Sequence, residues 1–321
     1  MAQTSVIIIG AGIAGLAAGC YAQMNGYDTE IYEAHDKPGG LCTAWKRKGY
    51  TVDGCIHHLA GASPGVELYR LWEELGAVQG REMVFRDTLT QVESADGQVL
   101  TVYTDIDQLE RHMKQLSPAD AKVIEEYTNG ARQFARIDLF SLMTMTPLQT
   151  ALKAWPVVGA FMKWSRLTLD QFAAGFQDPF LRRAFPTVQY DFADIPMFLH
   201  LNFLACCHNK TLGWPKGGAL SLAQSIADRY ERLGGRIHYR SRVSRVLVEG
   251  DRAVGVIADG TEHRADVVIS AADGHSTIFD MLGGEFANER VRRYYDAAPR
   301  HIDMALQVSF GVNRDMSQEP Q

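Results

Sequence analysis

Three glycines close to the N-terminus, Gly10, Gly12 and Gly15, have the spacing of a phosphate-binding turn, and they follow directly after the β-branched run at residues 6–9. Gly10 permits a tight turn, Gly12 lets the backbone approach a pyrophosphate at the N-terminus of a helix, and Gly15 allows that helix to pack on the strand. The residues that we predict to form this turn are Gly10, Gly12, Ile13, Ala14 and Gly15.

A carboxylate at the end of the next expected strand supports this interpretation. Residues 16–26 have helical composition and end in glycine, and residues 29–33 read as a strand that ends at Glu33. The Glu33 side chain can accept hydrogen bonds from a ribose diol. The order strand, glycine turn, helix, strand and acid within a unit of roughly 30 residues predicts dinucleotide binding. A glycine-rich turn without a ligand is the alternative.

Two motifs beyond Glu33 point to a family. A Gly-Gly pair is followed by a strand that ends in the pattern Asp-x-Gly-x-x-His. The residues of these motifs are Gly39, Gly40, Asp53, Gly54 and His57. Together with the glycine turn, they make the sequence resemble the flavin-dependent amine oxidase superfamily, and within it the group of phytoene desaturases, carotenoid isomerases and retinol saturases.

The resemblance implies FAD as the cofactor, with Gly39 and Gly40 near the flavin phosphates. An Arg often follows the Gly-Gly pair in the wider superfamily, whereas Leu41 occupies that position here, as the carotenoid-type group allows. We therefore expect Leu41 at the cofactor site but no side-chain clamp on the phosphate there. The basic cluster at residues 46–48 is expected to be a solvated turn between two strands, or to attract an anionic cofactor or a membrane surface.

The resemblance also covers a second nucleotide-binding stretch. Val243 matches a position that meets the adenine through its backbone in the family, and Ala271 lies in the segment 270–273 that approaches the dinucleotide. A plain turn into a helix capped by Asp273 is an equally open interpretation of that segment. The expected elements of this stretch are a helix at 219–233, strands at 236–239, 241–248 and 253–258, and a buried parallel strand at 265–270.

We expect an α/β fold, with a Rossmann-type FAD-binding domain of the glutathione-reductase-like kind and an inserted α+β substrate domain. The predicted FAD-binding domain is discontinuous and spans residues 1–63 and 211–290, with the substrate domain at 64–210. Residues 291–321 would begin a truncated return to the substrate domain. The late glycine-rich motif that closes the flavin site in the family is not found after Asp273, so the sequence is expected to be a fragment or a shortened relative.

The middle of the chain holds an apolar stretch with few charges at residues 137–164. We expect Pro147 and Pro156 to divide it, and its charged residues Asp138 and Lys153 argue against a transmembrane helix. Two interpretations stay open, an interfacial helix and a buried helical pair that lines the substrate cavity. The residues that favour the interfacial helix are Trp155, Lys163, Trp164 and Arg166.

Other elements follow from local patterns. We expect an amphipathic helix at 66–75, a hairpin within 84–103 that turns at 95–97, and a helical region at 167–183. A further helix would open at Ser117, which is a plausible cap, and residues 303–312 alternate like a strand.

Composition limits the class of protein. Of the 321 residues, 46% are hydrophobic and 22% are charged, which excludes a disordered chain. The net charge of −6 argues against nucleic acid as a main partner.

The five cysteines are odd in number and spread out, so we expect no disulfide framework and a reducing, cytoplasmic setting. Cys206-Cys207-His208 lacks a second Cys/His pair, so no metal site is predicted. Glycines interrupt the uncharged stretch at 6–22, and no Lys or Arg precedes it, which argues against a signal peptide.

These expectations together predict an oxidoreductase in which the flavin carries the chemistry. The flavin N5 would exchange a hydride with an allylic carbon of an isoprenoid lipid, as desaturase, saturase or isomerase, while the protein supplies an apolar tunnel and a possible peripheral membrane contact. His57 and His58 are candidates for a proton donor, with structural histidines at a strand end as the alternative, and no catalytic residue is assigned. Two other functions stay open: an amine or small-molecule oxidase, and a non-catalytic escort of lipids or prenylated proteins.

Overall fold

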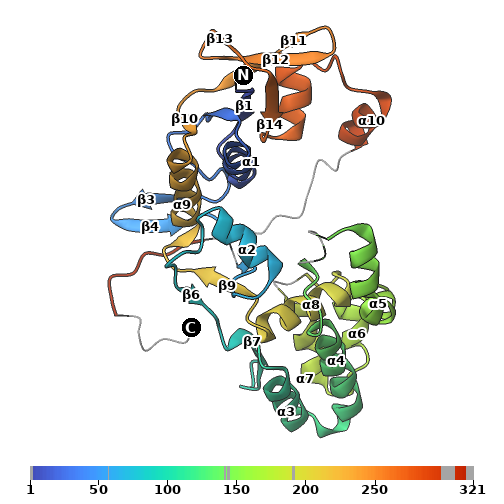
Figure 1. Ribbon diagram of the computed structural model, residues 1–321. Coiled ribbons are helices and arrows are strands. Elements are labelled where there is room, and N and C mark those ends of the chain that lie inside the picture. The colour runs from blue at the N-terminus through green and yellow to red at the C-terminus, as the bar shows by residue number, and fades with distance from the viewer. Residues whose placement is uncertain are drawn as a thin grey trace. The chain divides into compact units, whose positions relative to one another are not determined.

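The structure is a computed structural model that describes residues 3–56, 58–140, 142, 145–189, 192–297 and 308–315 (Figure 1). The chain divides into two compact units. Unit 1 comprises Met1–Ile56, Leu75–Ala77 and Gly217–Gln321, and unit 2 comprises His57–Glu74 and Val78–Lys216.

Unit 1 is built on a four-stranded parallel sheet. Strand β1 (Ser5–Ile9) lies between β2 (Asp28–Tyr32) and β14 (Val267–Ser270), and β10 (Arg236–His238) pairs with the other side of β2. The apolar run of β1 is buried throughout, with Ile8 fully inaccessible to solvent. A β-branched run without polar residues is typical of a strand with neighbours on both sides and layers on both faces, as the sequence predicts for β1.

The prediction of a buried strand at 265–270 is wrong in one respect. β14 pairs with β1 alone, at the edge of the sheet, and Val267 is 40% exposed. An apolar run does not show whether a strand lies at the centre or at the edge of a sheet, because only the tertiary fold decides which neighbours it has.

Helices and a second sheet cover the two faces of the parallel sheet (Figure 1). On one face, α1 (Ile13–Met24) packs against α9 (Gly218–Arg232), and a Cβ on Gly19 would lie 2.7 Å from the Tyr230 ring. On the other face, Ile7 and Ile9 share an apolar core with Val246 of an antiparallel sheet. Its strands are β11 (Val243–Glu249), β12 (Arg252–Ala258) and β13 (Thr261–Arg264). Unit 1 is thus a layered α/β fold.

The remaining elements of unit 1 lie outside this frame. The antiparallel pair β3 (Ala44–Arg47) and β4 (Tyr50–Asp53) encloses the exposed turn at Lys48. Of the cluster at 46–48, Lys48 lies in the turn expected from the sequence, whereas Lys46 and Arg47 are the exposed last residues of β3. After β14 come the π-helical turn η4 (Ser276–Met281) and α10 (Glu289–Ala297).

The strand expected at 303–312 is not found. Residues 303–307 lie outside the described residues, and residues 308–312 belong to no strand. Alternation of apolar residues is therefore not sufficient here, because a strand also needs a neighbour for its backbone hydrogen bonds.

Unit 2 combines short strands with a group of helices. Its strands are β5 (Leu59–Ala60), β6 (Met83–Val84), β7 (Thr88–Glu93), β8 (Val99–Tyr103) and β9 (Leu212–Pro215). Its longer helices are α2 (Glu67–Glu74), α3 (Ile106–Leu116), α4 (Ala121–Phe134), α5 (Pro147–Trp164) and α8 (Met197–His208). Its short helices are η1 (Pro118–Asp120), α6 (Leu169–Ala173), α7 (Pro179–Ala184) and η3 (Phe185–Thr187).

A large aromatic core holds the helices of unit 2 together. Tyr127, Phe134, Trp164 and Phe176 are buried within it, and Gly130 of α4 lets Trp164 of α5 come close, since a Cβ on Gly130 would lie 2.9 Å from that ring. The hairpin of β7 and β8 turns where the sequence predicts it, with the Gly97 N–H donating to the Ser94 carbonyl.

Three local predictions in unit 2 are corrected. The helix α5 runs without interruption through Pro156. A proline inside a helix removes one backbone hydrogen bond, but tertiary packing can compensate for that loss. The Ser117 hydroxyl donates to the Asp120 carboxylate rather than capping a helix through a backbone N–H. The helical region at 167–183 is two short helices, α6 and α7, rather than one.

Candidate functional site

The glycine turn lies at the carboxyl end of β1. Gly10 has a φ of +96°, which favours glycine, and its N–H donates to the Tyr32 carbonyl at the end of β2. Gly12 is the N-cap of α1, with no side-chain hydrogen bond to the cap, and the first turn of α1 carries no acidic residue. Ile13 and Ala14 supply the first helical N–H groups, so the positive end of the helix dipole lies where an anion would bind.

The three glycines are required for different reasons. A Cβ on Gly15 would lie 1.9 Å from the Gly10 carbonyl oxygen, so internal packing alone demands a glycine there. Gly12 differs, because its φ is −67° and a Cβ would meet nothing closer than the Gly40 Cα at 4.0 Å. The fold itself therefore tolerates a side chain at Gly12, whereas a ligand that approaches the backbone at that point would not. This open space is the feature that best fits a bound pyrophosphate.

The Gly-Gly pair lies beside this turn. The Gly39 N–H donates to the Ala11 carbonyl at 2.8 Å, and Gly12 and Gly39 form a parallel bridge. Gly39 and Gly40 have φ values of +113° and +58°, which explains a pair of glycines at this point. The Leu41 side chain is 86% exposed, in keeping with the absence of a clamp at that position.

Glu33 also lies at the glycine turn. Its buried carboxylate accepts hydrogen bonds from the Ala11 N–H at 2.6 Å, through Oε2, and from the His35 N–H at 2.8 Å, through Oε1. A carboxylate has about four acceptor positions, so these two bonds leave room for the two hydroxyls of a ribose. The residues present therefore fit the adenosine end of FAD.

Val243 and Ala271 reach the same edge of the sheet from the second half of unit 1. The Ser241 N–H donates to the Glu33 carbonyl at 2.8 Å, which anchors the segment that leads to Val243 at the start of β11. The Ala271 N–H donates to the Ile9 carbonyl, and the Ala271 oxygen would lie 3.5 Å from a Cβ on Gly10. All sequence-predicted cofactor residues thus belong to unit 1. Asp273 caps the following turn, because its Oδ2 accepts the Ser276 N–H at 2.8 Å.

The sequence reasoning missed two arrangements. The Asp53 carboxylate accepts the Ala219 N–H at 3.0 Å at the start of α9, so this motif residue ties β4 to a helix far away in sequence. A Cβ on Gly218 would lie 2.5 Å from Asp53 Oδ2, so the glycine before Ala219 serves this contact, and the Gly-Gly pair at 217–218 was the available signal. The second arrangement is a buried histidine network in unit 2, for which a lone His200 in an apolar run gave no distinctive signal.

Burial keeps several of the cysteines in the thiol form. All five are free, and burial, with a contribution from Cys55, raises the pKa of the Cys42 thiol to about 11. Burial likewise raises the pKa values of Cys206 to about 11 and of Cys207 to about 12. Thiols that stay protonated at neutral pH act as small apolar packing groups.

The two histidines proposed as proton donors belong to unit 2. His57 lies outside the described residues. The His58 ring lies edge-on to Phe203, with 4.8 Å between the ring centroids, and within 6.5 Å of the Trp214 ring. This aromatic setting fits the structural interpretation of His58.

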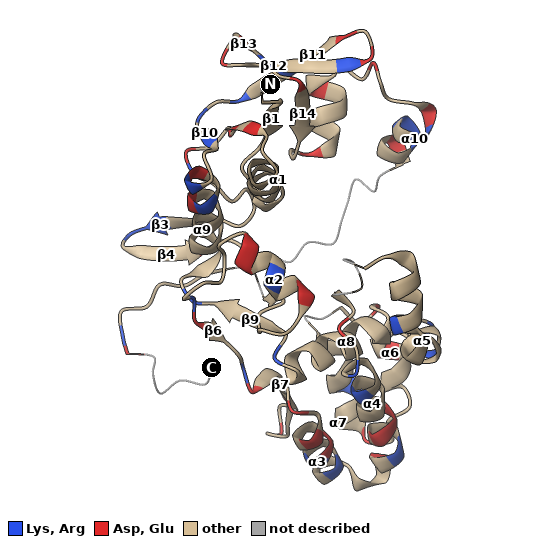
Figure 2. Ribbon diagram, viewed as in Figure 1, with Lys and Arg blue, Asp and Glu red and all other residues tan. Residues whose placement is uncertain are grey.

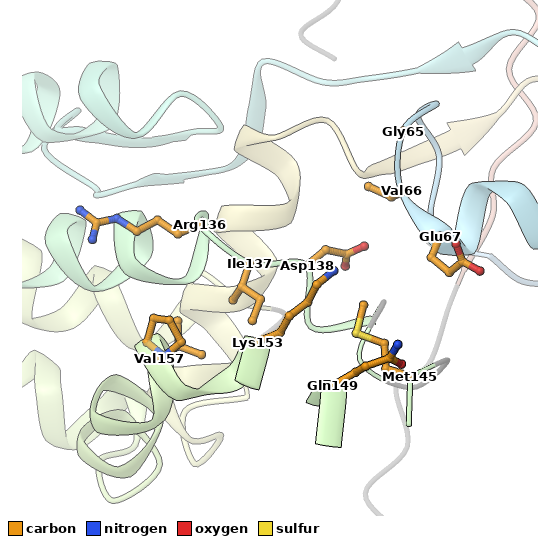
Figure 3. Close-up of a pocket in the computed structure, with 11 residues that line it drawn as sticks. Gly65, Val66, Glu67, Arg136, Ile137, Asp138, Met145, Gln149, Lys153 and Val157 are labelled. Atoms are coloured by element: carbon orange, nitrogen blue, oxygen red, sulfur yellow. The ribbon is translucent and has the colours of Figure 1, made fainter. Parts of the chain in front are cut away.

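A cavity of about 900 Å³ lies in unit 2 beside α5 (Figure 3). Gln149, Lys153 and Val157 of α5 line it, with Glu67 at the start of α2 and Asp138 after α4. The lining mixes charged side chains with apolar ones, among them Val66, Ile137 and Met145. A second cavity of about 470 Å³ lies elsewhere in unit 2, against β7 and α8, and its lining is mixed as well, with Leu89, Phe203 and Trp214 beside Arg86, Gln91 and Glu93.

Comparison with known proteins supports a flavoprotein. The family model for flavin containing amine oxidoreductases matches residues 13–277. The chain is 30% identical to a lycopene-forming phytoene desaturase of Paracoccus sp. over 88% of its own length and 57% of that protein's length. It is 23% identical to the all-trans-retinol 13,14-reductase of Danio rerio, with 96% of this chain and 54% of that protein covered. The chain thus spans little more than half the length of these relatives.

Solved structures show the same fold. A fatty acid isomerase from P. acnes that produces CLA superposes with a TM-score of 0.53 at 15% identity, over 91% of this chain and 63% of the other. An oxidoreductase from Methanosarcina mazei superposes with a TM-score of 0.52 at 20% identity, over 91% and 64%. These structures share the fold of this chain. The match over residues 13–277 establishes that the chain belongs to the family of flavin containing amine oxidoreductases, with FAD as its cofactor.

Proposed function

We propose that the protein is an FAD-dependent oxidoreductase that acts on an apolar, isoprenoid-like lipid. The observation that carries the cofactor half of the proposal is the open space at Gly12, beside the buried carboxylate of Glu33. The lipid half is supported by the relatives named phytoene desaturase and all-trans-retinol 13,14-reductase. Bound FAD would supply a flavin ring that accepts or donates a hydride.

The residues of unit 1 would divide the binding of FAD among them. The first turn of α1, with Gly10, Gly12 and Gly15, would hold the pyrophosphate, and Gly39 and Gly40 would approach it from the other side. Glu33 would accept hydrogen bonds from the ribose. The Val243 backbone would meet the adenine, and Ala271 would border the dinucleotide.

The domain assignment follows from these roles. In this proposal, residues 1–63 and 211–290 form the FAD-binding domain, residues 64–210 form the substrate domain, and residues 291–321 begin a return to the substrate domain. The compact units differ from this division, because residues 57–63 and 211–216 belong to unit 2 and α10 belongs to unit 1. The substrate domain would orient the lipid and exclude water from it. The cavity against β7 and α8 is the candidate for the lipid-binding site, because Phe203, Trp214 and Leu89 form an apolar part of its lining.

We also propose that α5 contacts a membrane surface peripherally. None of the described helices is long and apolar enough to cross a bilayer. Three apolar side chains on one face of α5 are largely exposed: Leu148 at 71%, Leu152 at 69% and Trp155 at 78%. Residues 147–166 contain two lysines and one arginine but no acidic residue, and Figure 2 shows α5 without acidic positions. This combination suits an anionic lipid surface.

Anaerobic mixing of the FAD-loaded chain with a lipid tests the proposed reaction. A polyene hydrocarbon that can be desaturated should bleach the flavin absorption of the oxidised protein. Alternatively, an isomerase would convert a cis polyene without net bleaching, which chromatography of the lipid detects. Oxidation of an amine with release of hydrogen peroxide would instead identify an amine oxidase. A chain that binds lipid but retains no FAD would be a non-catalytic escort, and the proposed activity would be wrong.

A further inference from the structure

The second cavity of unit 2, against β7 and α8, has one polar side chain whose amide is tied to the helix core. The cavity measures about 470 Å³ and lies between the strand β7 and the side chains of Val188, Gln189, Phe203 and Trp214. Leu89, Val188, Phe203 and Trp214 suit a hydrocarbon chain, whereas the rest of the lining is polar, with Arg86, Thr90, Gln91, Glu93 and Thr187. Gln189 is the polar side chain of this set whose amide is held by a network that runs into the core of unit 2.

This network consists of three side chains in a row. The His200 ring is fully buried, with its Nδ1 2.9 Å from Gln189 Oε1 and its Nε2 2.7 Å from the Tyr127 hydroxyl. The Tyr127 and His200 rings are stacked, at 5.7 Å between centroids and 11° between planes. Tyr127 comes from α4 and His200 from α8, so the helix core positions both groups.

Hydrogen-bond satisfaction assigns a direction to the network. The buried Tyr127 hydroxyl has no other acceptor among the described residues, so it donates to His200 Nε2. Burial lowers the pKa of His200 to about 4, so the ring is neutral at neutral pH and carries its one hydrogen on Nδ1. His200 therefore donates to Gln189 Oε1. This hydrogen bond fixes the orientation of the Gln189 amide. The NH₂ group of that amide donates to no side chain or backbone group among the described residues.

We propose that this cavity binds a lipid whose apolar chain ends in an oxygen acceptor, and that the Gln189 NH₂ donates a hydrogen bond to that oxygen. His200 and Tyr127 act as positioning residues, because they fix which end of the Gln189 amide is available. The inference rests on the proposed function, in which unit 2 binds an apolar lipid, and adds that the preferred lipid is oxygenated. A pure hydrocarbon would cover the half-buried amide donor without pairing it, which is unfavourable.

Binding of matched lipids to the full chain tests this selectivity. The probe is tritiated geranylgeraniol, and the label that stays with the protein after gel filtration measures its binding. Geranylgeranoic acid and the corresponding hydrocarbon without the hydroxyl are added as unlabelled competitors. We expect the alcohol and the acid to bind about tenfold more tightly than the hydrocarbon, the usual worth of one well-formed hydrogen bond. Gln189→Leu should reduce the affinity for the alcohol to that for the hydrocarbon and leave the affinity for the hydrocarbon unchanged. Gln108→Leu, at an exposed position on α3, should change neither.

Tyr127→Phe tests the positioning role separately. Without the tyrosine hydroxyl, His200 can carry its hydrogen on either nitrogen, so the Gln189 amide can turn and present its oxygen to the cavity. The preference for the alcohol over the hydrocarbon should then fall, while binding of the hydrocarbon persists. If Tyr127 had only a structural role, its substitution would weaken the binding of both lipids equally.

The outcomes separate this inference from the proposed function. Equal binding of alcohol and hydrocarbon by the parent chain, or an unchanged preference in Gln189→Leu, would overturn the inference and leave lipid binding intact. Tighter binding of the acid alone would assign recognition to Arg86, which lines the same cavity and stacks over the Trp214 ring at 4.8 Å, and would also overturn the role of Gln189. No binding of any lipid by the folded chain would contradict both. If Tyr127→Phe does not fold, Gln189→Leu alone decides, because Gln189 is only half-buried.

Discussion

The carboxylate of Glu33 is bonded directly to the backbone of the glycine turn, since its Oε2 accepts the Ala11 N–H at 2.6 Å. This contact joins the end of β2 to the loop after β1, and it places a negative charge beside the N-terminus of α1. The same carboxylate is therefore both a support of the turn and the candidate acceptor for the ribose.

Substitution of Glu33 should weaken the binding of FAD. Glu33→Gln keeps the shape but replaces one acceptor by a donor, so we expect the Kd for FAD to rise about tenfold or more, and Glu33→Arg should abolish binding. Titration of the chain with FAD, followed by flavin fluorescence, measures the change. Glu30→Gln is the control, because Glu30 lies within β2, three residues before Glu33, and pairs with Arg236 outside the turn. An unchanged Kd in Glu33→Arg would refute the ribose role.

Substitution of Gly15 should destabilise unit 1 rather than affect FAD binding specifically. A methyl group there would overlap the Gly10 carbonyl oxygen, at 1.9 Å, and neither backbone segment can move without breaking the turn. We expect Gly15→Ala to lower the free energy of unfolding by about 3 kcal/mol, measured by urea denaturation. Gly159→Ala, where a Cβ on α5 would meet nothing within 4 Å, should not lower stability. Equal stability of parent and Gly15→Ala would show that the turn is built differently.

The exposed face of α5 should be needed for membrane binding. Vesicle flotation of the chain with liposomes of phosphatidylcholine and phosphatidylglycerol should carry the protein upward, because apolar side chains and lysines act together. The double change Leu152→Gln and Trp155→Gln should abolish flotation, and 1 M salt should weaken it. Val157 is unsuitable as a control position, because its side chain is buried on the opposite side of α5. Flotation of the double variant at the parental level would remove α5 from the interface.

Titration of His200 should make the stability of unit 2 depend on pH. Burial lowers the pKa of this histidine to about 4, from an ordinary value of 6.5. The unfolded chain takes up the proton near pH 6.5 and the folded chain only near pH 4, so the free energy of unfolding should fall as the pH is lowered between these values. At pH 5, unfolding should take up about one more proton in the parent than in His200→Phe.

Tryptophan fluorescence can follow this transition, because four of the five tryptophans lie in unit 2. Tyr127→Phe should be less stable than the parent but should keep the pH dependence, since burial rather than the tyrosine causes the shift. Identical pH profiles for the parent and His200→Phe would contradict the assignment of a buried, neutral His200.

The glycine turn was predictable because its signals are local. The spacing of Gly10, Gly12 and Gly15 after a β-branched run reports backbone requirements within a few residues, and β1, α1 and β2 form where that pattern expects them. The position of the strand β14 at the edge of the sheet was not predictable, since it depends on which elements become neighbours in space.

Contacts between distant residues were hidden from sequence reasoning for the same reason. The bond from Ala219 to Asp53 joins residues far apart in the chain, and so does the row of Tyr127, His200 and Gln189. Pro156 shows the converse: a proline is a strong local signal for the end of a helix, yet α5 continues through it. Packing in the tertiary fold decides such cases, and a local pattern does not contain it.

The most direct test of the account is the retention of FAD by the parent chain and by Gly12→Ala. Each protein is mixed with FAD and passed through gel filtration, and the absorption spectrum of the protein peak is recorded with its melting temperature. We predict that the parent keeps its flavin bands, whereas Gly12→Ala melts at the same temperature as the parent but emerges without flavin, because the fold has room for the methyl group and the pyrophosphate does not. Retention of FAD by Gly12→Ala at the parental level, or a folded parent that retains none, would contradict the assignment of this turn as the cofactor site.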